Sequence, residues 1–80
     1  MHSVNKFCLG QIVTSDFSGP KRSMYEIIDR DLVMIKNQIN NKDLGVVLGH
    51  HKEGANNTWV KILTSSGSTG YVPSIWIRPL

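Results

Sequence analysis

The sequence predicts a small all-β protein, a compact barrel of five or six antiparallel strands with one 3₁₀ turn near residues 73–75. Three observations lead to this prediction. Segments rich in β-branched and aromatic residues recur at spacings of about 8–12 residues. Turn-forming residues separate these segments, and no stretch has the pattern of a long helix. A length of 80 residues allows one domain, which we expect to span residues 1–80.

The first half of the chain contains two predicted strands separated by a long loop. Residues 7–14 are rich in β-forming side chains and make the first strand. We expect residues 14–31 to form a long loop excursion, because a Gly-Pro pair and polar residues occupy its start. Residues 24–31 fit either a strand or one helical turn. The continuous apolar run at residues 32–35 is of strand length and predicts the second strand.

The second half contains the more regular predicted strands. Residues 44–50 form one strand, in which Gly45 suggests a bulge or a close approach of another backbone. Residues 58–64 form the next, with every second side chain on the same face. The remaining predicted elements are a hairpin loop at 65–69 with Gly67 available for a positive φ, a strand at 70–73, the 3₁₀ turn at 73–75 and a last strand at 76–78.

The apolar residues of these strands predict the core. Its expected members are Leu9, Ile12, Val13, Leu32, Met34, Val46, Leu48, Val60, Ile62, Val72 and Ile77.

Composition narrows the class of protein further. Hydrophobic residues make up 40% and charged residues 19% of the chain, which is typical of a folded soluble domain. The longest apolar runs are far shorter than the about 20 residues that a membrane helix needs. No signal-peptide pattern opens the chain, so we expect a protein that is not secreted. The net charge of +3 comes from basic residues spread along the sequence, which is compatible with an acidic partner without requiring one.

No group of residues predicts catalysis, a metal site or a cofactor. Adjacent strand residues point to opposite faces, so His50 and His51 are more simply a solvated strand end than a chelating pair. Cys8 is the single cysteine, which excludes an internal disulfide, and we expect it to be a buried small hydrophobe. The sequence therefore predicts a non-enzymatic protein with no cofactor and no small-molecule substrate.

The C-terminal third resembles the second half of a Src-homology-3 domain. The resemblance covers residues 59–77, where a tryptophan opens a strand, a glycine-containing hairpin follows, and a Gly-Tyr-Val-Pro-Ser run precedes the last strand. The Ala-Leu-Tyr-Asp-Tyr signature of the peptide-binding members is missing from the first half. The Gly-Val-Val strand within residues 44–48 is similar to small barrels encoded by tailed bacteriophages. These resemblances imply a Src-homology-3-like barrel and a viral structural or adaptor protein, located in the cytoplasm or the virion.

The family's peptide groove, lined by aromatic residues and one proline, implies a binding surface here. The match places Pro73 at the groove proline and Trp76 at the second groove aromatic. The groove tryptophan matches either Thr58 or Trp59, depending on the length of the hairpin. Trp59 and Trp76 are expected in packing or in a dry protein interface, and Trp76 equally fits a plug at the bottom of the barrel.

We therefore expect a protein partner, or self-assembly, at a surface around the C-terminal aromatics and the loop that follows the first strand. Its predicted residues are Tyr71, Pro73, Trp76, Phe17, Lys21 and Arg22. The two basic residues of that loop would help to orient an acidic partner. The alternative is a small barrel that binds nucleic acid through a basic face formed by Lys21-Arg22, residues 50–52 and Lys61.

Overall fold

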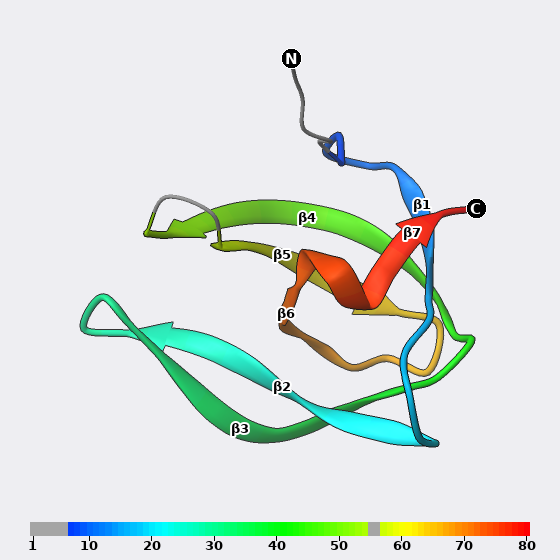
Figure 1. Cartoon of the computed structure of the whole chain (residues 1–80), viewed down its shortest axis with the longest axis horizontal. Coiled ribbons are helices and arrows are strands. Elements are labelled where there is room, and N and C mark those ends of the chain that lie inside the picture. Colours follow the sequence, from blue (N-terminus) through cyan, green and yellow to red (C-terminus); the bar gives the residue numbers. More distant parts are fainter. Residues whose placement is uncertain (1–6, 55–56) are drawn as a thin grey trace.

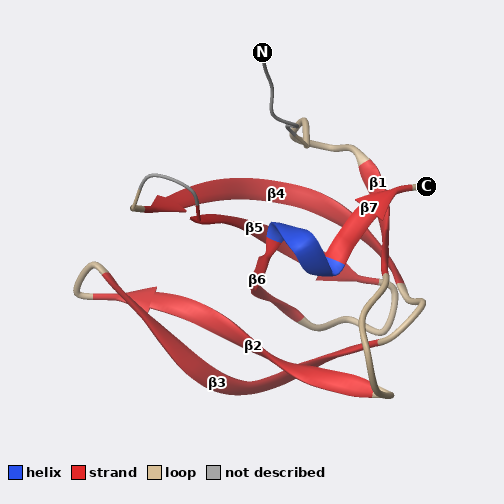
Figure 2. Ribbon diagram, in the orientation of Figure 1, coloured by secondary structure: helices blue, strands red, loops and turns tan. Residues whose placement is uncertain are grey.

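The computed structural model describes residues 7–54 and 57–80, which form one antiparallel sheet of seven strands (Figure 1). Strand accounts for nearly all of the regular structure, with a single short helical turn before the last strand (Figure 2). The elements are β1 (Ile12–Ser15), β2 (Lys21–Ile28), β3 (Asp31–Asn40), β4 (Leu44–Glu53), β5 (Asn57–Thr64), β6 (Thr69–Pro73), η1 (Ser74–Trp76) and β7 (Ile77–Pro79). The all-β class and the 3₁₀ turn are confirmed, and the strand number is seven rather than five or six.

The compact antiparallel architecture agrees with the prediction, and the sheet is not closed on itself. The strands follow the order β3-β2-β6-β5-β4-β1-β7, and β3 and β7 each have one paired neighbour. The junction with the fewest paired residues is between β2 and β6, which pair only where Tyr25 lies opposite Tyr71. Beyond that pair the two strands diverge, and the β2–β3 ribbon extends on one side of β6 and η1 while the β4–β5 ribbon extends on the other (Figure 1).

The expected loop excursion over residues 14–31 is wrong in part, because eight of these residues form strand β2. β2 pairs with β3 on both sides of an irregularity between Ser23 and Tyr25. Asp29 and Arg30 form the two-residue turn of this hairpin with φ values of 53° and 71°. Such a turn usually carries Asn-Gly or Asp-Gly. Because Arg30 stands where the glycine would be, this turn has no recognisable hairpin signal in the sequence.

The core lies on the inner face of the sheet and agrees with five of the predicted positions. Its buried apolar residues are Val13, Met24, Ile39, Val47, Val60, Ile62, Val72 and Ile77. In β4, Val47 points inward rather than Val46 and Leu48, and the register shifts immediately afterwards. This reversed phase explains two of the errors, because a change of one residue moves side chains to the opposite face.

The other predicted core residues that are not buried are Leu9, Ile12, Leu32 and Met34. Leu9 is 67% exposed and Cys8 is exposed as well, because the chain turns at Gly10 before β1 begins. Ile12 and Met34 are exposed, whereas Leu32 is half-buried. The expectation that Cys8 is a buried hydrophobe is therefore wrong.

Candidate functional site

The segment before β2 meets the turn before β7, which brings Phe17 against Trp76. The Asp16 N–H donates to the Trp76 carbonyl at 2.7 Å, and the Phe17 N–H donates to the Asn41 side-chain oxygen at 3.0 Å. The two rings are half-buried, with centroids 5.6 Å apart and planes tilted by 52°. Both rings pack against the edge of the core. Trp76 therefore contributes to packing while keeping part of its ring in contact with solvent.

Arg22 completes this group, which we call the arginine cluster (Phe17, Arg22 and Trp76). Its Cζ lies 5.3 Å from the centre of the Phe17 ring and 5.1 Å from the centre of the Trp76 ring. Its Nε and Nη2 both donate to the Ser18 carbonyl, at 3.2 and 3.0 Å. Arg22 lies opposite the buried Ile39 in the β2–β3 ladder. Its side chain therefore projects from the same, inner face of the ribbon as the side chain of Ile39. The guanidinium is thus held by two rings and one carbonyl.

Asp16 is the acidic residue nearest in sequence to this cluster, and its carboxylate pairs with cations outside the cluster. Asp16 lies 2.6 Å from the Lys42 Nζ and 3.3 Å from the Arg78 Nη1. The hydrogen bond and charge of Lys42 lower the pKa of Asp16, and Arg78 adds to the effect. Asp16 is therefore ionised at neutral pH and balances two cations on the side of β1 and β7.

A second group of aromatic residues, the aromatic face (Tyr25, Trp59, Tyr71 and Pro73), lies on the outer side of β2, β6 and β5. Its side chains alternate with the buried ones along β5 and β6, and this alternation was predicted for β5. Trp59 lies directly opposite Pro73 in the β5–β6 ladder. The ring of Tyr25 meets Trp59 nearly edge to face, with centroids 4.9 Å apart.

Basic side chains border the aromatic face around Tyr71. The Lys61 Nζ lies 6.0 Å from the centre of the Tyr71 ring, and the His51 ring lies 6.2 Å from it. Lys61 is also the direct neighbour of Tyr71 across the ladder. Positive charge is therefore present beside the rings, which is a feature of surfaces for anionic partners.

Five of the six predicted site residues divide between these two groups, and Lys21 belongs to neither. Phe17, Arg22 and Trp76 come together in the arginine cluster, and Tyr71 and Pro73 lie on the aromatic face. Lys21 is exposed and lies opposite Asn40 at the start of β2. The sequence missed Tyr25 because its contact with Trp59 depends on the pairing of β2 with β6, which no local pattern reveals.

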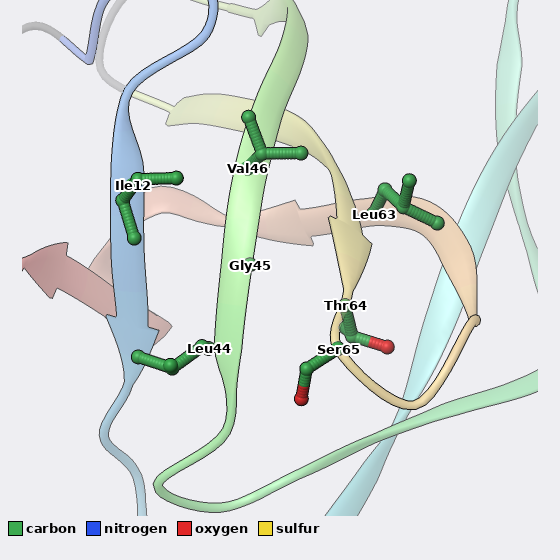
Figure 3. Close-up of a pocket in the computed structure, with 7 residues that line it drawn as sticks. All are labelled: Ile12, Leu44, Gly45, Val46, Leu63, Thr64 and Ser65. Atoms are coloured by element: carbon green, nitrogen blue, oxygen red, sulfur yellow. The ribbon is translucent and has the colours of Figure 1, made fainter.

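A separate apolar groove of ≈ 280 Å³ lies on the outer side of β1, β4 and β5 (Figure 3). Its apolar side chains project from the three neighbouring strands, and Thr64 and Ser65 lie at one end (Figure 3). Ile12 is 48% exposed and Leu44 is 45% exposed. The sequence analysis expected Ile12 in the core and did not predict this groove.

The two adjacent histidines of β4 contact different partners. A ring nitrogen of His50 contacts the Phe7 carbonyl, whereas the His51 Nε2 lies 3.0 Å from a Glu53 carboxylate oxygen. Their backbone partners on β5 are Val60 and Trp59, so their side chains leave opposite faces. Among residues 7–54 and 57–80, no three metal-ligating side chains gather in one place.

A test for membrane-spanning helices and three comparisons with known proteins complete the description of the chain. In the part that the structure describes, no helix is long and apolar enough to cross a membrane. A search of protein-family models, of curated proteins and of solved structures found no match to this chain.

Proposed function

We propose that the chain is a non-enzymatic protein-interaction module that binds a segment of a protein partner through the arginine cluster and the aromatic face. The observation that carries the proposal is the pairing of Trp59 opposite Pro73 in the β5–β6 ladder, with Trp76 three residues further along the chain. Large aromatic side chains that remain partly exposed are frequent anchors of protein interfaces.

The resemblance to the Src-homology-3 family supports this proposal. An open antiparallel sheet with a 3₁₀ turn before its last strand is compatible with a Src-homology-3-like fold. The register of β5 and β6 favours Trp59, rather than Thr58, at the groove tryptophan position. The setting that we propose from the resemblance is a structural or adaptor role in a tailed bacteriophage.

Nucleic acid is the second candidate partner, because Lys61 lies beside the rings of the aromatic face. The ring geometry favours a protein instead. Phe17 and Trp76 are tilted by 52°, and Tyr25 meets Trp59 at 69°. Mutually tilted rings contact one another rather than presenting a row of free faces on which successive bases stack.

The proposal predicts that peptides selected for binding will depend on Trp59. The experiment selects binders from a random library of peptides of about ten residues and measures their affinity by fluorescence anisotropy. Trp59→Ala should weaken binding at least about tenfold, because it removes a large interface anchor. Leu63→Ala is the matched control, since Leu63 is an exposed apolar residue on the same strand and face. It should change the affinity by less than about twofold.

Three outcomes would contradict the proposal. The first is a larger loss with Leu63→Ala than with Trp59→Ala, which would place binding in the apolar groove. The second is that the folded protein selects no peptide. The third is tighter binding of single-stranded oligonucleotides with a steep loss at higher salt, which is the behaviour of a nucleic-acid binder. Circular dichroism of each variant establishes that it is folded.

A further inference from the structure

The guanidinium of Arg22 is held in one position before any partner arrives. Two rings lie within 5.3 Å of its Cζ, and two of its nitrogens donate to the same carbonyl. An arginine side chain normally loses considerable rotamer freedom when it binds a ligand. Here the contacts with Phe17, Trp76 and Ser18 have already removed much of that freedom.

The same guanidinium has donors left over. It carries five N–H groups, and the hydrogen bonds in the described part of the chain use one from Nε and one from Nη2. The two donors of Nη1 and the second donor of Nη2 have no partner there. These nitrogens form the edge of the guanidinium that binds a carboxylate with two parallel hydrogen bonds.

No acid among the described residues neutralises Arg22. The ion pairs of residues 7–54 and 57–80 are Lys42–Asp16, Arg78–Asp16 and His51–Glu53. Asp43 accepts hydrogen bonds from Ser65 and Ser66. The remaining carboxylates, Glu26, Asp29 and Asp31, lie at the far end of the β2–β3 ribbon, toward its turn. A fixed cation therefore remains in the arginine cluster without a counter-ion among the described residues.

We propose that Arg22 is the receptor for a carboxylate of the protein partner, and that the partner segment carries an Asp or Glu next to an apolar residue. The carboxylate pairs with the free edge of the guanidinium, and the apolar residue packs against the exposed parts of Phe17 and Trp76. This inference rests on the proposed function, because it concerns the same surface. Lys21 is a neighbouring exposed charge that no ring or carbonyl of the described residues holds, so it contributes only to the general positive potential.

A purely structural role for Arg22 makes a different prediction. In that role its aliphatic stem covers the rings at the edge of the core, and the charged end is dispensable. Arg22→Met keeps an unbranched apolar stem and would then retain binding. In the receptor role, Arg22→Met folds but loses the preference for an acidic segment.

The test compares two pools of peptides, each of about ten residues with blocked ends. One pool carries Glu beside Leu or Phe, and the other carries Gln in place of that Glu. The wild-type protein should bind the Glu pool at least about tenfold more tightly than the Gln pool. Arg22→Gln and Arg22→Met should both reduce this ratio to about one, and Arg22→Lys should retain only part of it. Lys21→Gln, which removes the same charge from the adjacent residue, should leave the ratio within about twofold of wild type.

The inference is overturned if Arg22→Gln and Lys21→Gln lower the ratio equally, or if Arg22→Met keeps it. Equal affinity of the wild-type protein for both pools, with Trp59→Ala weakening both, would also overturn it while the proposed function stands. Absence of binding to either pool would contradict both proposals. If a single-stranded oligothymidylate binds more tightly than the Glu pool, the group that Arg22 binds is a phosphate rather than a carboxylate. That result would overturn the inference.

Discussion

At the scale of single residues, Gly70 allows β2 to approach β6. A Cβ at Gly70 would lie 2.8 Å from the Met24 Cβ and 3.1 Å from the Tyr25 carbonyl oxygen. Both distances are shorter than ordinary van der Waals contact, and both neighbours belong to β2. Because β2 and β6 pair only at Tyr25 and Tyr71, this approach also sets the position of the aromatic face.

We expect Gly70→Ala to destabilise the protein by about 1–3 kcal/mol, because the added methyl group overpacks the contact with β2. Urea denaturation followed by circular dichroism measures the effect. Gly49→Ala is the control, since the nearest atom to a Cβ there is 3.9 Å away. Equal destabilisation by the two substitutions would contradict the account of Gly70.

Gly45 and Gly70 show which close contacts of a glycine can be predicted from the sequence and which cannot. The prediction of a close backbone approach at Gly45 is confirmed, because a Cβ there would lie 3.2 Å from the Leu63 carbonyl oxygen. That contact comes from the neighbouring β5, which was itself predicted. The contact of Gly70 comes from β2, which the local sequence pattern places in a loop, so its importance could not be predicted.

At the scale of elements, the β2–β3 hairpin contains a turn that its sequence does not favour. Arg30 has a φ of 71°, in the left-handed region where a side chain is disfavoured. The hairpin between β5 and β6, by contrast, has Gly67 at a φ of 94°, as predicted from its sequence. The ribbon that carries Arg22 and Tyr25 is therefore the one with the less favourable turn.

We expect Arg30→Gly to stabilise the protein by about 0.5 kcal/mol. Relief of the left-handed conformation contributes roughly 1–2 kcal/mol, and the greater freedom of glycine in the unfolded chain offsets about 0.4–1 kcal/mol of it. Thermal and urea unfolding measure the difference. Arg30→Ala removes the same charge but keeps a Cβ, so it should give no such gain. A gain equal to that of glycine would show that charge, rather than the turn, is responsible.

At the scale of the whole molecule, the proposed surface is assembled from segments far apart in the chain. Phe17 and Arg22 come from the segment around the start of β2, and Trp59, Pro73 and Trp76 come from the C-terminal half. The local strand patterns and the resemblance were sufficient to place the C-terminal residues. They were insufficient for the open sheet, the phase of β4 and the contact of Tyr25 with Trp59, because each depends on strand pairing between distant segments.

The central claim is that a protein segment binds at the arginine cluster and the aromatic face. The most direct measurement is a ¹H–¹⁵N NMR titration of the protein with a selected peptide. We expect the largest shifts at the indole N–H groups of Trp59 and Trp76 and at the side-chain N–H groups of Arg22. Largest shifts at the backbone amides of Ile12 and Leu63, which line the apolar groove on the other part of the sheet, would contradict the claim.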